Sequence, residues 1–348
     1  MGNWRSLFFI LLLGGIILGK SQDKILNGEI VKLSSKLLNE ERTVWVHLPK
    51  SYYNDKIKPA KYPVIYLLDA NINYGYFTGV IDFFTRGPYA EMPEVIVVAI
   101  ENTDRPRDFT PSKSFVINPN NPSVKLFETS GGANQFLKFI NEELKPFIAS
   151  HYRVSGFNVL VGHSFGGLFT LYTFLSQPQS FNAYIANDPS LWWDKHLLVN
   201  VLKENLNKNK SLGKNISLFI SEANNAEEEN KWDNAMTSAI QEFVKLMRSQ
   251  QEVAFQSSYY PKDHHGTVSL PGNIDGLRFI FKGFRLDIKQ ISKNPQLLME
   301  SYQHFSKQKG AEFLPSETYL NAIIKFTKEN NPTNEAYFQQ LKKILYSL

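Results

Sequence analysis

A serine enclosed by glycines is the first candidate for chemistry in the sequence. Ser164 lies in GHSFGG, residues 162–167, directly after the apolar run NVLVG and before the helical pattern GGLFTLYTFLSQ. In a G-x-S-x-G pattern the serine occupies a tight strand-to-helix turn, which has room only for small neighbours such as Gly162 and Gly166. Such a serine becomes a nucleophile when a base takes its proton. The spacing predicts a catalytic Ser164; the alternative is a structural turn with an incidental serine.

Position along the chain narrows the choice of the base. This motif predicts the order serine, acid, histidine. Among the seven histidines, only His264 and His265 lie in the polar loop that follows the last predicted strand, where a general base is expected. We favour His265, which precedes Gly266. A surface pair and a metal site are the alternatives, and metal is the weaker one because no third ligand is nearby.

The acid is less well defined by the sequence. Glu222 directly follows the strand pattern ISLFIS and stands where a strand end would direct a carboxylate toward the histidine. We favour Glu222, although the carboxylates that follow it remain open as alternatives or as a solvated first turn of a helix. These are Glu227, Glu228, Glu229 and Asp233.

A tetrahedral intermediate needs two fixed N–H donors for its oxyanion. The residue after the nucleophile, Phe165, is expected to supply one of them. The other is expected from the loop after the strand pattern PVIYLLD, hence from Ala70 or Asn71, and the mechanism below uses Ala70.

The elements that must position these residues alternate along the chain. Apolar and β-branched runs predict strands, and several of them lack alternation, as strands buried on both faces do. These runs cover residues 43–49, 63–69, 94–100, 158–162, 181–186, 216–221 and 254–260. Helical patterns at residues 133–152 and 231–250 predict an α/β fold with a mostly parallel central sheet covered by helices, whose first strands could pair antiparallel. Residues 108–132 are predicted to form a long loop.

Both ends of the chain differ from this alternation. Residues 1–22 place Arg5 before a short apolar run and small polar residues, which predicts a secretory signal peptide; a retained anchor is the alternative. Residues 23–286 are predicted to form the catalytic domain and residues 287–348 a small helical extension. The mature protein is therefore expected to be exported, to the periplasm or the extracellular space, without a membrane span.

Composition excludes several classes of protein. The chain of 348 residues has no cysteine, which excludes disulfides, thiol nucleophiles and iron–sulfur clusters. Without residues 1–22 the formal net charge falls from +5 to +3, and the lysines are scattered, so nucleic-acid binding is not expected. No metal or organic cofactor is expected, and the sequence leaves the oligomeric state open.

Five stretches in order give the chain a family resemblance. These are YPVIYLLDA, NTDRPRDFTP, GHSFGG, NDPSLWWD and DHHGTVSLPG. From roughly Ile25 to Arg285 the chain resembles the Putative esterase family of α/β hydrolases, which includes esterase D-like enzymes and the Fes- and IroE-type siderophore esterases. The resemblance implies an α/β-hydrolase fold and ester hydrolysis through an acyl-serine intermediate.

The resemblance also implies roles for single residues. Ser164 matches the family's nucleophile and His265 its base, while Arg107 and Trp192 match positions that line the substrate cleft. Surface pairing of the arginine with a neighbouring aspartate, and a rim position for the tryptophan, are the alternatives. Ala70 departs from the family's usual glycine but keeps its N–H. Some siderophore esterases work with a serine–histidine pair alone, and the helical extension resembles the tetratricopeptide-like tails of some relatives.

The resulting hypothesis is an exported serine esterase. Ser164 attacks the ester carbonyl, His265 moves the proton, Glu222 orients the histidine, and the N–H groups of Phe165 and Ala70 hold the oxyanion. The expected partner is a small-molecule or glycan-linked ester: a siderophore, a simple acyl ester or an acylated glycan. An acyltransferase on the same scaffold and a non-catalytic binding protein with a hydrolase shell are the rivals.

Overall fold

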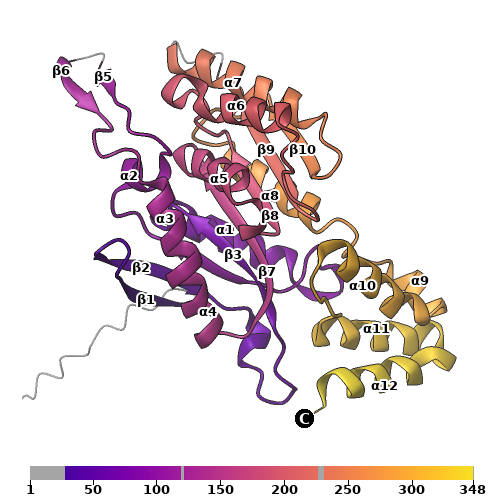
Figure 1. The fold of residues 1–348 in the computed structure, drawn as a ribbon. Helices are drawn as coiled ribbons and strands as arrows, with labels where there is room; N and C mark the ends of the chain where they lie inside the picture. The colour runs from indigo at the N-terminus through magenta and orange to yellow at the C-terminus, as the bar shows by residue number, and fades with distance from the viewer. Residues whose placement is uncertain (1–27, 119–120, 226–230, 348) are drawn as a thin grey trace, which may run out of the picture.

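The protein is built around one mixed sheet. The computed structural model describes residues 28–118, 121–225 and 231–347 (Figure 1). The sheet has eight strands in the order β1-β2-β4-β3-β7-β8-β9-β10, and a separate two-stranded sheet pairs β5 with β6. The strands are β1 (Gly28–Ser35), β2 (Glu40–His47), β3 (Tyr62–Leu68), β4 (Ile96–Ile100), β5 (Val116–Asn118), β6 (Asn121–Leu126), β7 (Val154–His163), β8 (Ala183–Asn187), β9 (Ser217–Ala223) and β10 (Ala254–Tyr260).

Strand direction follows the sequence prediction. β1 pairs antiparallel with β2, and β2 antiparallel with β4, whereas every pair from β4 to β10 is parallel. The predicted α/β class with a mostly parallel sheet is confirmed, and each predicted strand is present with ends shifted by a few residues. Because parallel strands end at one edge, the loops after β3, β4, β7, β8, β9 and β10 open on the same side of the molecule.

Helices cover both faces of this sheet. They are α1 (Ala70–Phe84), α2 (Arg105–Phe109), α3 (Ala133–Phe139), α4 (Lys145–His151), α5 (Phe165–Ser176), α6 (Trp193–Asn207), α7 (Lys231–Met247), α8 (Ser269–Ile280), α9 (Ile288–Lys293), α10 (Gln296–Lys309), α11 (Glu317–Asn330) and α12 (Glu335–Tyr346). Short helical turns are η1 (Lys50–Tyr53), η2 (Gly87–Tyr89), η3 (Ile140–Leu144), η4 (Pro178–Ser180) and η5 (Pro332–Asn334). None of the helices in the described part of the chain is both long and apolar enough to cross a bilayer.

The pleat of the strands divides the apolar side chains between two cores. Along β3, Tyr66 and Leu68 join the core with α3 to α7, while Ile65 and Leu67 face the opposite core with α1 and α8. This alternation follows from the period of two in a strand. All four side chains are almost fully buried, which explains why β3 reads as a continuous apolar run in the sequence.

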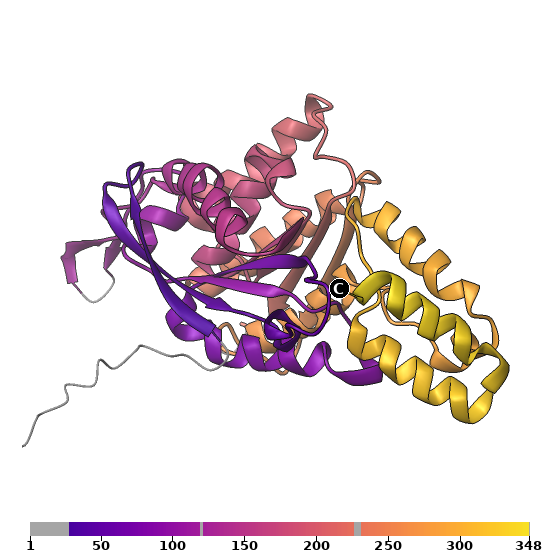
Figure 2. The same cartoon turned by 90° about the horizontal axis from the view of Figure 1, so that it is seen from below.

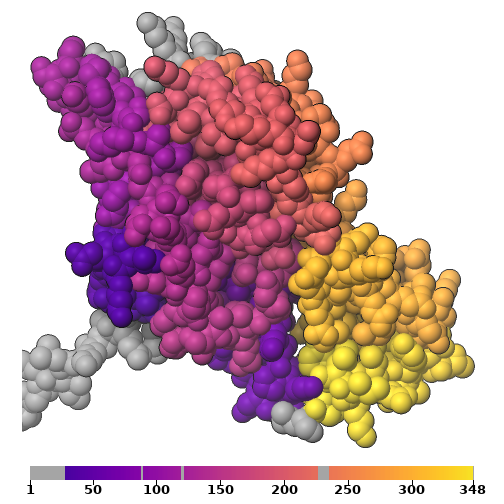
Figure 3. Space-filling view, in the orientation of Figure 1, coloured from indigo at the N-terminus to yellow at the C-terminus, as the bar shows by residue number. Residues whose placement is uncertain are grey.

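The C-terminal helices extend the second of these cores. Phe313, after α10, packs its ring 5.3 Å from that of Phe157 on β7, and the Lys58 N–H donates to Tyr346 O at the end of α12. Figures 1 and 2 show helices α9 to α12 as a layer at one end of the sheet, and Figure 3 shows their surface in contact with the rest of the protein. The extension therefore shares apolar core with the α/β part.

The loop expected over residues 108–132 contains regular structure. It holds the end of α2 and the β5–β6 hairpin, which projects from the body in Figure 1. The base of the hairpin is fixed, because the Ser130 hydroxyl both donates to Ser114 O and accepts from the Ser114 N–H. The loop prediction was wrong for these short strands, since Pro122 lies within the exposed β6, where a strand pattern is hard to recognise.

Candidate active site

Ser164 occupies the turn between β7 and α5. Its backbone has φ 59° and ψ −119°, a conformation that is costly for a residue with a side chain and that recurs at functional sites. A Cβ atom at Gly162 would lie only 2.2 Å from Gly166 O, so the turn admits no larger residue at that position. The sequence folds this way because glycines flank the serine where strand and helix approach most closely.

The neighbouring strand holds the serine from both sides. The Ser164 N–H donates to Asn187 O at 3.0 Å, and Ser164 O accepts from the Ser190 N–H at 3.1 Å. The two hydroxyl oxygens, Ser164 Oγ and Ser190 Oγ, are 3.2 Å apart. The segment after β8 therefore sets the position of the nucleophile candidate, and Ser190 is a contact that the sequence did not indicate.

A histidine–carboxylate pair lies at the same edge of the sheet. His265 Nδ1 is 2.6 Å from Asp188 Oδ2, and the Asp188 side chain is fully buried. The other carboxylate oxygen of Asp188 accepts from the Ala223 N–H at 3.0 Å. With Nδ1 donating to the carboxylate, Nε2 is the nitrogen of the neutral ring that accepts a proton. This is the arrangement of a base oriented by an acid.

The carboxylate on His265 is Asp188, whereas the sequence favoured Glu222. Glu222 instead accepts from Gln241 Nε2 of α7 at 2.8 Å, and burial raises the pKa of its carboxyl group. The physical reason is the pleat: on β9 it is Ser221 that faces inward, toward Asn187, and Glu222 points to the other face. Of the alternative acids, Glu227, Glu228 and Glu229 lie outside the described residues, and Asp233 lies in a stretch of α7 whose side chains are not described.

The sequence contains a signal for Asp188. NDPS follows the buried strand next to the nucleophile strand, so an aspartate stands at a strand end beside Ser164. Elimination by chain order did not separate it from the later carboxylates, because an acid after either strand precedes the histidine.

His163 fixes the loop that carries His265. Its Nε2 donates to His265 O at 2.7 Å, and the two imidazole rings are 4.6 Å apart. Burial, and then the neighbouring His265, lower the pKa of His163 to about 4. The His163 ring is therefore neutral at ordinary pH and acts as a hydrogen-bond donor to the backbone.

Two helix N-termini converge near the serine. Phe165 is the first residue of α5 and Ala70 the first residue of α1, and the first N–H groups of a helix have no partner within that helix. The two turns are close, because a Cβ atom at Gly166 would lie 3.2 Å from Asp69 Oδ2 and 3.5 Å from Leu68 Cβ. The predicted pair of donors is thus placed on adjacent turns.

The arginine beside this turn is Arg105. Arg105 Nε donates to Asp69 Oδ1 at 2.7 Å, and one terminal nitrogen donates to His163 O at 3.1 Å. Its guanidinium carbon lies 5.5 Å from the centre of the Phe165 ring. A second bond from the guanidinium reaches Asp69 Oδ2, and the side chain as a whole is 29 % exposed.

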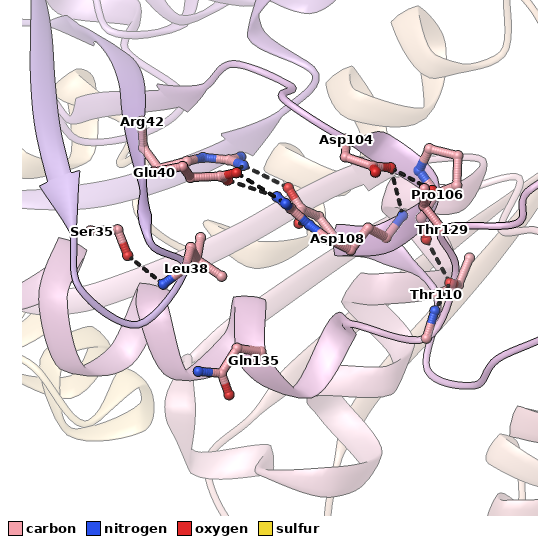
Figure 4. A network of polar contacts seen from close by, with 12 residues as sticks. Ser35, Leu38, Glu40, Arg42, Asp104, Pro106, Asp108, Thr110, Thr129 and Gln135 are labelled. Atoms are coloured by element: carbon pink, nitrogen blue, oxygen red, sulfur yellow. Dashed lines mark hydrogen bonds and ion pairs between the residues drawn. The ribbon is translucent and has the colours of Figure 1, made fainter.

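Arg107, the arginine favoured from the sequence, belongs to a different network. It makes a two-nitrogen pair with Glu40, at 2.7 and 3.0 Å, and its Nε donates to Asp108 at 2.7 Å. Glu40 also pairs with Arg42, and Arg42 with the buried Asp108 (Figure 4). The hydrogen bonds that Arg107 donates to Glu40, the largest cause, raise the pKa of Arg107. The structure places Arg107 in this ion-pair network rather than against the Ser164 turn, because α2 turns this side chain toward Glu40 at the start of β2.

Trp192 lies in an aromatic cluster next to Phe165. The ring centres of Trp192 and Phe165 are 5.8 Å apart, and Phe127, at the base of the hairpin, lies 5.1 Å from Phe165 and 6.4 Å from Trp192. Trp193 is almost fully buried, donates to Ser112 Oγ, and packs its ring 5.3 Å from that of Phe165. The structure thus brings Trp192 to the nucleophile turn and adds Phe127, whose sequence position gave no signal.

A metal ion would need several ligating side chains grouped together. Within residues 28–118, 121–225 and 231–347, no three His, Asp or Glu side chains are grouped so as to hold a metal ion.

The fold and the serine turn define a class, and the family follows from it. A mostly parallel sheet with a serine at the strand-to-helix turn after β7 is an α/β-hydrolase fold. The family model described as Putative esterase matches residues 35–265, and the chain belongs to this family. The resemblance noted in the sequence is confirmed.

Individual relatives are named siderophore esterases or hydrolases. The chain is 37% identical over 180 residues to the ferri-bacillibactin esterase BesA of Bacillus subtilis, covering 49% of this chain and 61% of BesA. It is 42% identical over 100 residues to a siderophore enterobactin esterase of Emericella nidulans, which covers 27% of this chain and 33% of that protein. An IroE-like serine hydrolase from Shewanella oneidensis has a TM-score of 0.80 at 32% identity, covering 91% of this chain and 99% of that structure.

Proposed function

We propose that this protein cleaves carboxylic esters through an acyl-serine intermediate on Ser164. The observation that carries the proposal is the 2.6 Å hydrogen bond between His265 Nδ1 and the buried Asp188 carboxylate, at the edge of the sheet where Ser164 occupies a strained turn. A nucleophile, a base and an orienting acid are the three parts that this chemistry requires.

The reaction proceeds in two halves. Ser164 Oγ attacks the ester carbonyl carbon while its proton moves to His265 Nε2, and Asp188 stabilises the imidazolium that forms. The carbonyl oxygen becomes an oxyanion, which accepts from the N–H groups of Phe165 and Ala70. The alcohol leaves with the proton from His265, and a water molecule then repeats the sequence on the acyl-serine to release the acid.

We propose a siderophore ester as the substrate. Support comes from the names of the relatives and from the groups beside Ser164. Trp192 and Phe127 offer aromatic surface, and the partly exposed Arg105 offers a cation over the Phe165 ring. A planar, electron-rich acyl group fits such a wall. Export of the mature protein after loss of residues 1–22 belongs to this proposal.

The test is hydrolysis by the purified protein without residues 1–22. Enterobactin and a 4-nitrophenyl ester are incubated with the wild type and with Ser164→Ala, and the acids released are quantified by chromatography. The proposal expects both substrates to be cleaved by the wild type and neither by the variant. Turnover that survives in Ser164→Ala would contradict it, and glycerol esters formed in the presence of added glycerol would favour the acyltransferase.

A further inference from the structure

A chain of buried polar side chains lies beneath the candidate active site. Its five members come from four elements: Asn73 and Tyr76 on α1, Asn273 on α8, Asn187 on β8 and Ser221 on β9. Asn73, Asn187, Ser221 and Asn273 are each at most 5% exposed. Polar groups this deeply buried lower the stability of a fold unless they find partners, so their presence needs a reason.

Each member donates a hydrogen bond to the next one. Ser221 Oγ donates to Asn187 Oδ1 at 2.8 Å, and Asn187 Nδ2 donates to Asn273 Oδ1 at 2.7 Å. Asn273 Nδ2 then donates to the Tyr76 hydroxyl at 3.0 Å, and that hydroxyl donates to Asn73 Oδ1 at 3.2 Å. All these bonds run in one direction, so each donor polarises the next.

One end of this hydrogen-bonded network is attached to the backbone next to the oxyanion turn. Asn73 Nδ2 donates to Leu68 O at 3.1 Å, and the Asn73 N–H donates to Asp69 O at 3.0 Å. Asp69 has a left-handed backbone, with φ 58°, and directly precedes Ala70. The side chain of Asn73 thereby holds the strand end from which the proposed oxyanion donor follows.

At the other end of this hydrogen-bonded network, the backbones of Asn187 and Ser221 contact the nucleophile candidate and the acid. Asn187 O accepts from the Ser164 N–H, and Ser221 O accepts from the Asp188 N–H at 2.9 Å. The residues whose side chains form the network therefore also fix, through their backbones, the serine and the carboxylate. Asn273 joins the two ends, and it lies on α8, the helix that follows the His265 loop.

The packing against the network is tight at Gly272 on α8. A Cβ atom at Gly272 would lie 2.3 Å from Asn187 Oδ1 and 2.7 Å from Ser221 Oγ. The glycine beside Asn273 is what lets α8 approach β8 and β9 closely enough for the hydrogen bonds to form.

We propose that Asn273 and Tyr76 are positioning residues, which set the distance between the oxyanion turn and the serine–acid pair through this chain. The inference rests on the proposed function, because it needs Ala70 to act on the same oxyanion as Phe165. Neither side chain touches the reacting atoms. Their effect is to hold α1, which begins at Ala70, in register with β8, which contacts Ser164 through Asn187 and is followed by Asp188.

Tyr76→Phe is the sharpest test because it removes one oxygen atom and leaves the ring in place. We expect kcat for a 4-nitrophenyl ester to fall by about tenfold, with KM changed by less than about twofold, since a misplaced donor weakens only the transition state. Asn273→Leu, which interrupts the chain in both directions, is expected to lower kcat by about 100-fold. The rate of labelling by a fluorophosphonate probe, measured per folded molecule, is expected to fall in parallel.

Ser292→Ala is the matched control. Ser292 is fully buried on α9 and accepts from Asn331 Nδ2, so its loss removes a buried hydrogen bond in the extension. We expect its Tm to fall as in Tyr76→Phe while its kcat and labelling rate stay at the wild-type level. The assays are run well below every Tm.

The outcomes separate the two proposals. A Tyr76→Phe protein that folds, loses Tm like the control and keeps wild-type kcat and labelling would overturn the positioning role and leave the esterase intact. If Asn273→Leu does not fold, Tyr76→Phe alone decides. Wild-type protein that neither hydrolyses the ester nor reacts with the probe would overturn the proposed function, and this inference with it.

Discussion

Asp188 and Glu222 both stand at strand ends, yet only Asp188 contacts the histidine. Asp188 is fully buried, and its carboxylate accepts hydrogen bonds from His265, the Ala223 N–H and Asn225 Nδ2. Glu222 is bound to Gln241 on the opposite face of β9. In a serine–histidine–acid triad the carboxylate orients the imidazole by binding Nδ1. Removing the charge of Asp188 is therefore expected to affect the reaction, whereas removing that of Glu222 is not.

Substitution separates these two carboxylates. Asp188→Asn keeps the shape of the side chain but no longer stabilises the imidazolium, so kcat is expected to fall by about 10³-fold. Glu222→Gln, the matched control, is expected to stay within about twofold of the wild type. Both are measured as initial rates with a 4-nitrophenyl ester at saturation. A large loss of kcat in Glu222→Gln together with a small one in Asp188→Asn would show that Glu222, not Asp188, is the orienting acid.

His163 predicts a dependence of stability on pH. Its pKa is about 4 in the folded protein and about 6.5 in the unfolded chain, so the unfolded state binds more protons between these values. The contribution of the neutral His163 to the stability of the fold is therefore fully present above pH 6.5 and is lost as the pH falls toward 4. Between pH 7.5 and pH 4, the wild type is expected to lose roughly 2–3 kcal/mol more of its unfolding free energy than His163→Gln, a variant that keeps a donor to His265 O.

Urea denaturation at pH 7.5 and pH 4 measures this difference. If the wild type and His163→Gln change equally between the two pH values, His163 is not held in its neutral form by the fold.

At the scale of elements, the strand-to-helix turn depends on glycine at one position. A Cβ atom at Gly162 would meet Gly166 O at 2.2 Å, whereas nothing lies within 4 Å of a Cβ atom at Gly79, on the exposed side of α1. Replacing glycine by alanine is therefore expected to lower the stability of the fold at position 162 and to raise it at position 79.

Gly162→Ala is expected to lower the unfolding free energy by about 3 kcal/mol or more and to abolish activity, because backbone has to move. Gly79→Ala is expected to raise it by about 0.5–1 kcal/mol, since alanine favours a helix. Thermal unfolding followed by circular dichroism reports both. Equal effects at the two glycines would show that the turn has room that its geometry denies.

The sequence predicted elements better than contacts. Buried strands such as β3 and β7 and the serine turn have strong local patterns, and the structure places Ser164, His265, Phe165 and Ala70 at one edge. Glu222 and Arg107 make other contacts than expected, because the pleat of a strand or the turn of a helix decides which side chains along an element face the site. A difference of two residues along α2, Arg105 against Arg107, is not encoded in composition or chain order.

At the scale of the whole molecule, the C-terminal helices are part of the core. Phe313 packs against Phe157 of β7, Phe281 after α8 and Phe305 of α10, and it is 4% exposed. The helical extension predicted from residue 287 onward therefore shares an apolar cluster with the sheet. Shared burial couples the unfolding of two parts of a chain.

Phe313→Ala is expected to lower the free energy of unfolding by about 3–5 kcal/mol in a single transition, because a buried ring is lost from a core common to both parts. Differential scanning calorimetry of the mature chain measures this, with the rate at 25 °C as a check that the folded variant keeps its activity. Two separate transitions, of which only one shifts, would show instead that the extension folds independently.

The most direct test of the account is the covalent state of Ser164. Mature wild-type protein, Ser164→Ala and Asp188→Asn are treated with a fluorophosphonate probe, and intact mass is followed with time. The account predicts one adduct on the wild type, located by peptide mapping to Ser164, much slower labelling of Asp188→Asn, and none on Ser164→Ala. Folded wild-type protein that stays unlabelled, or labels equally in Ser164→Ala, would contradict it.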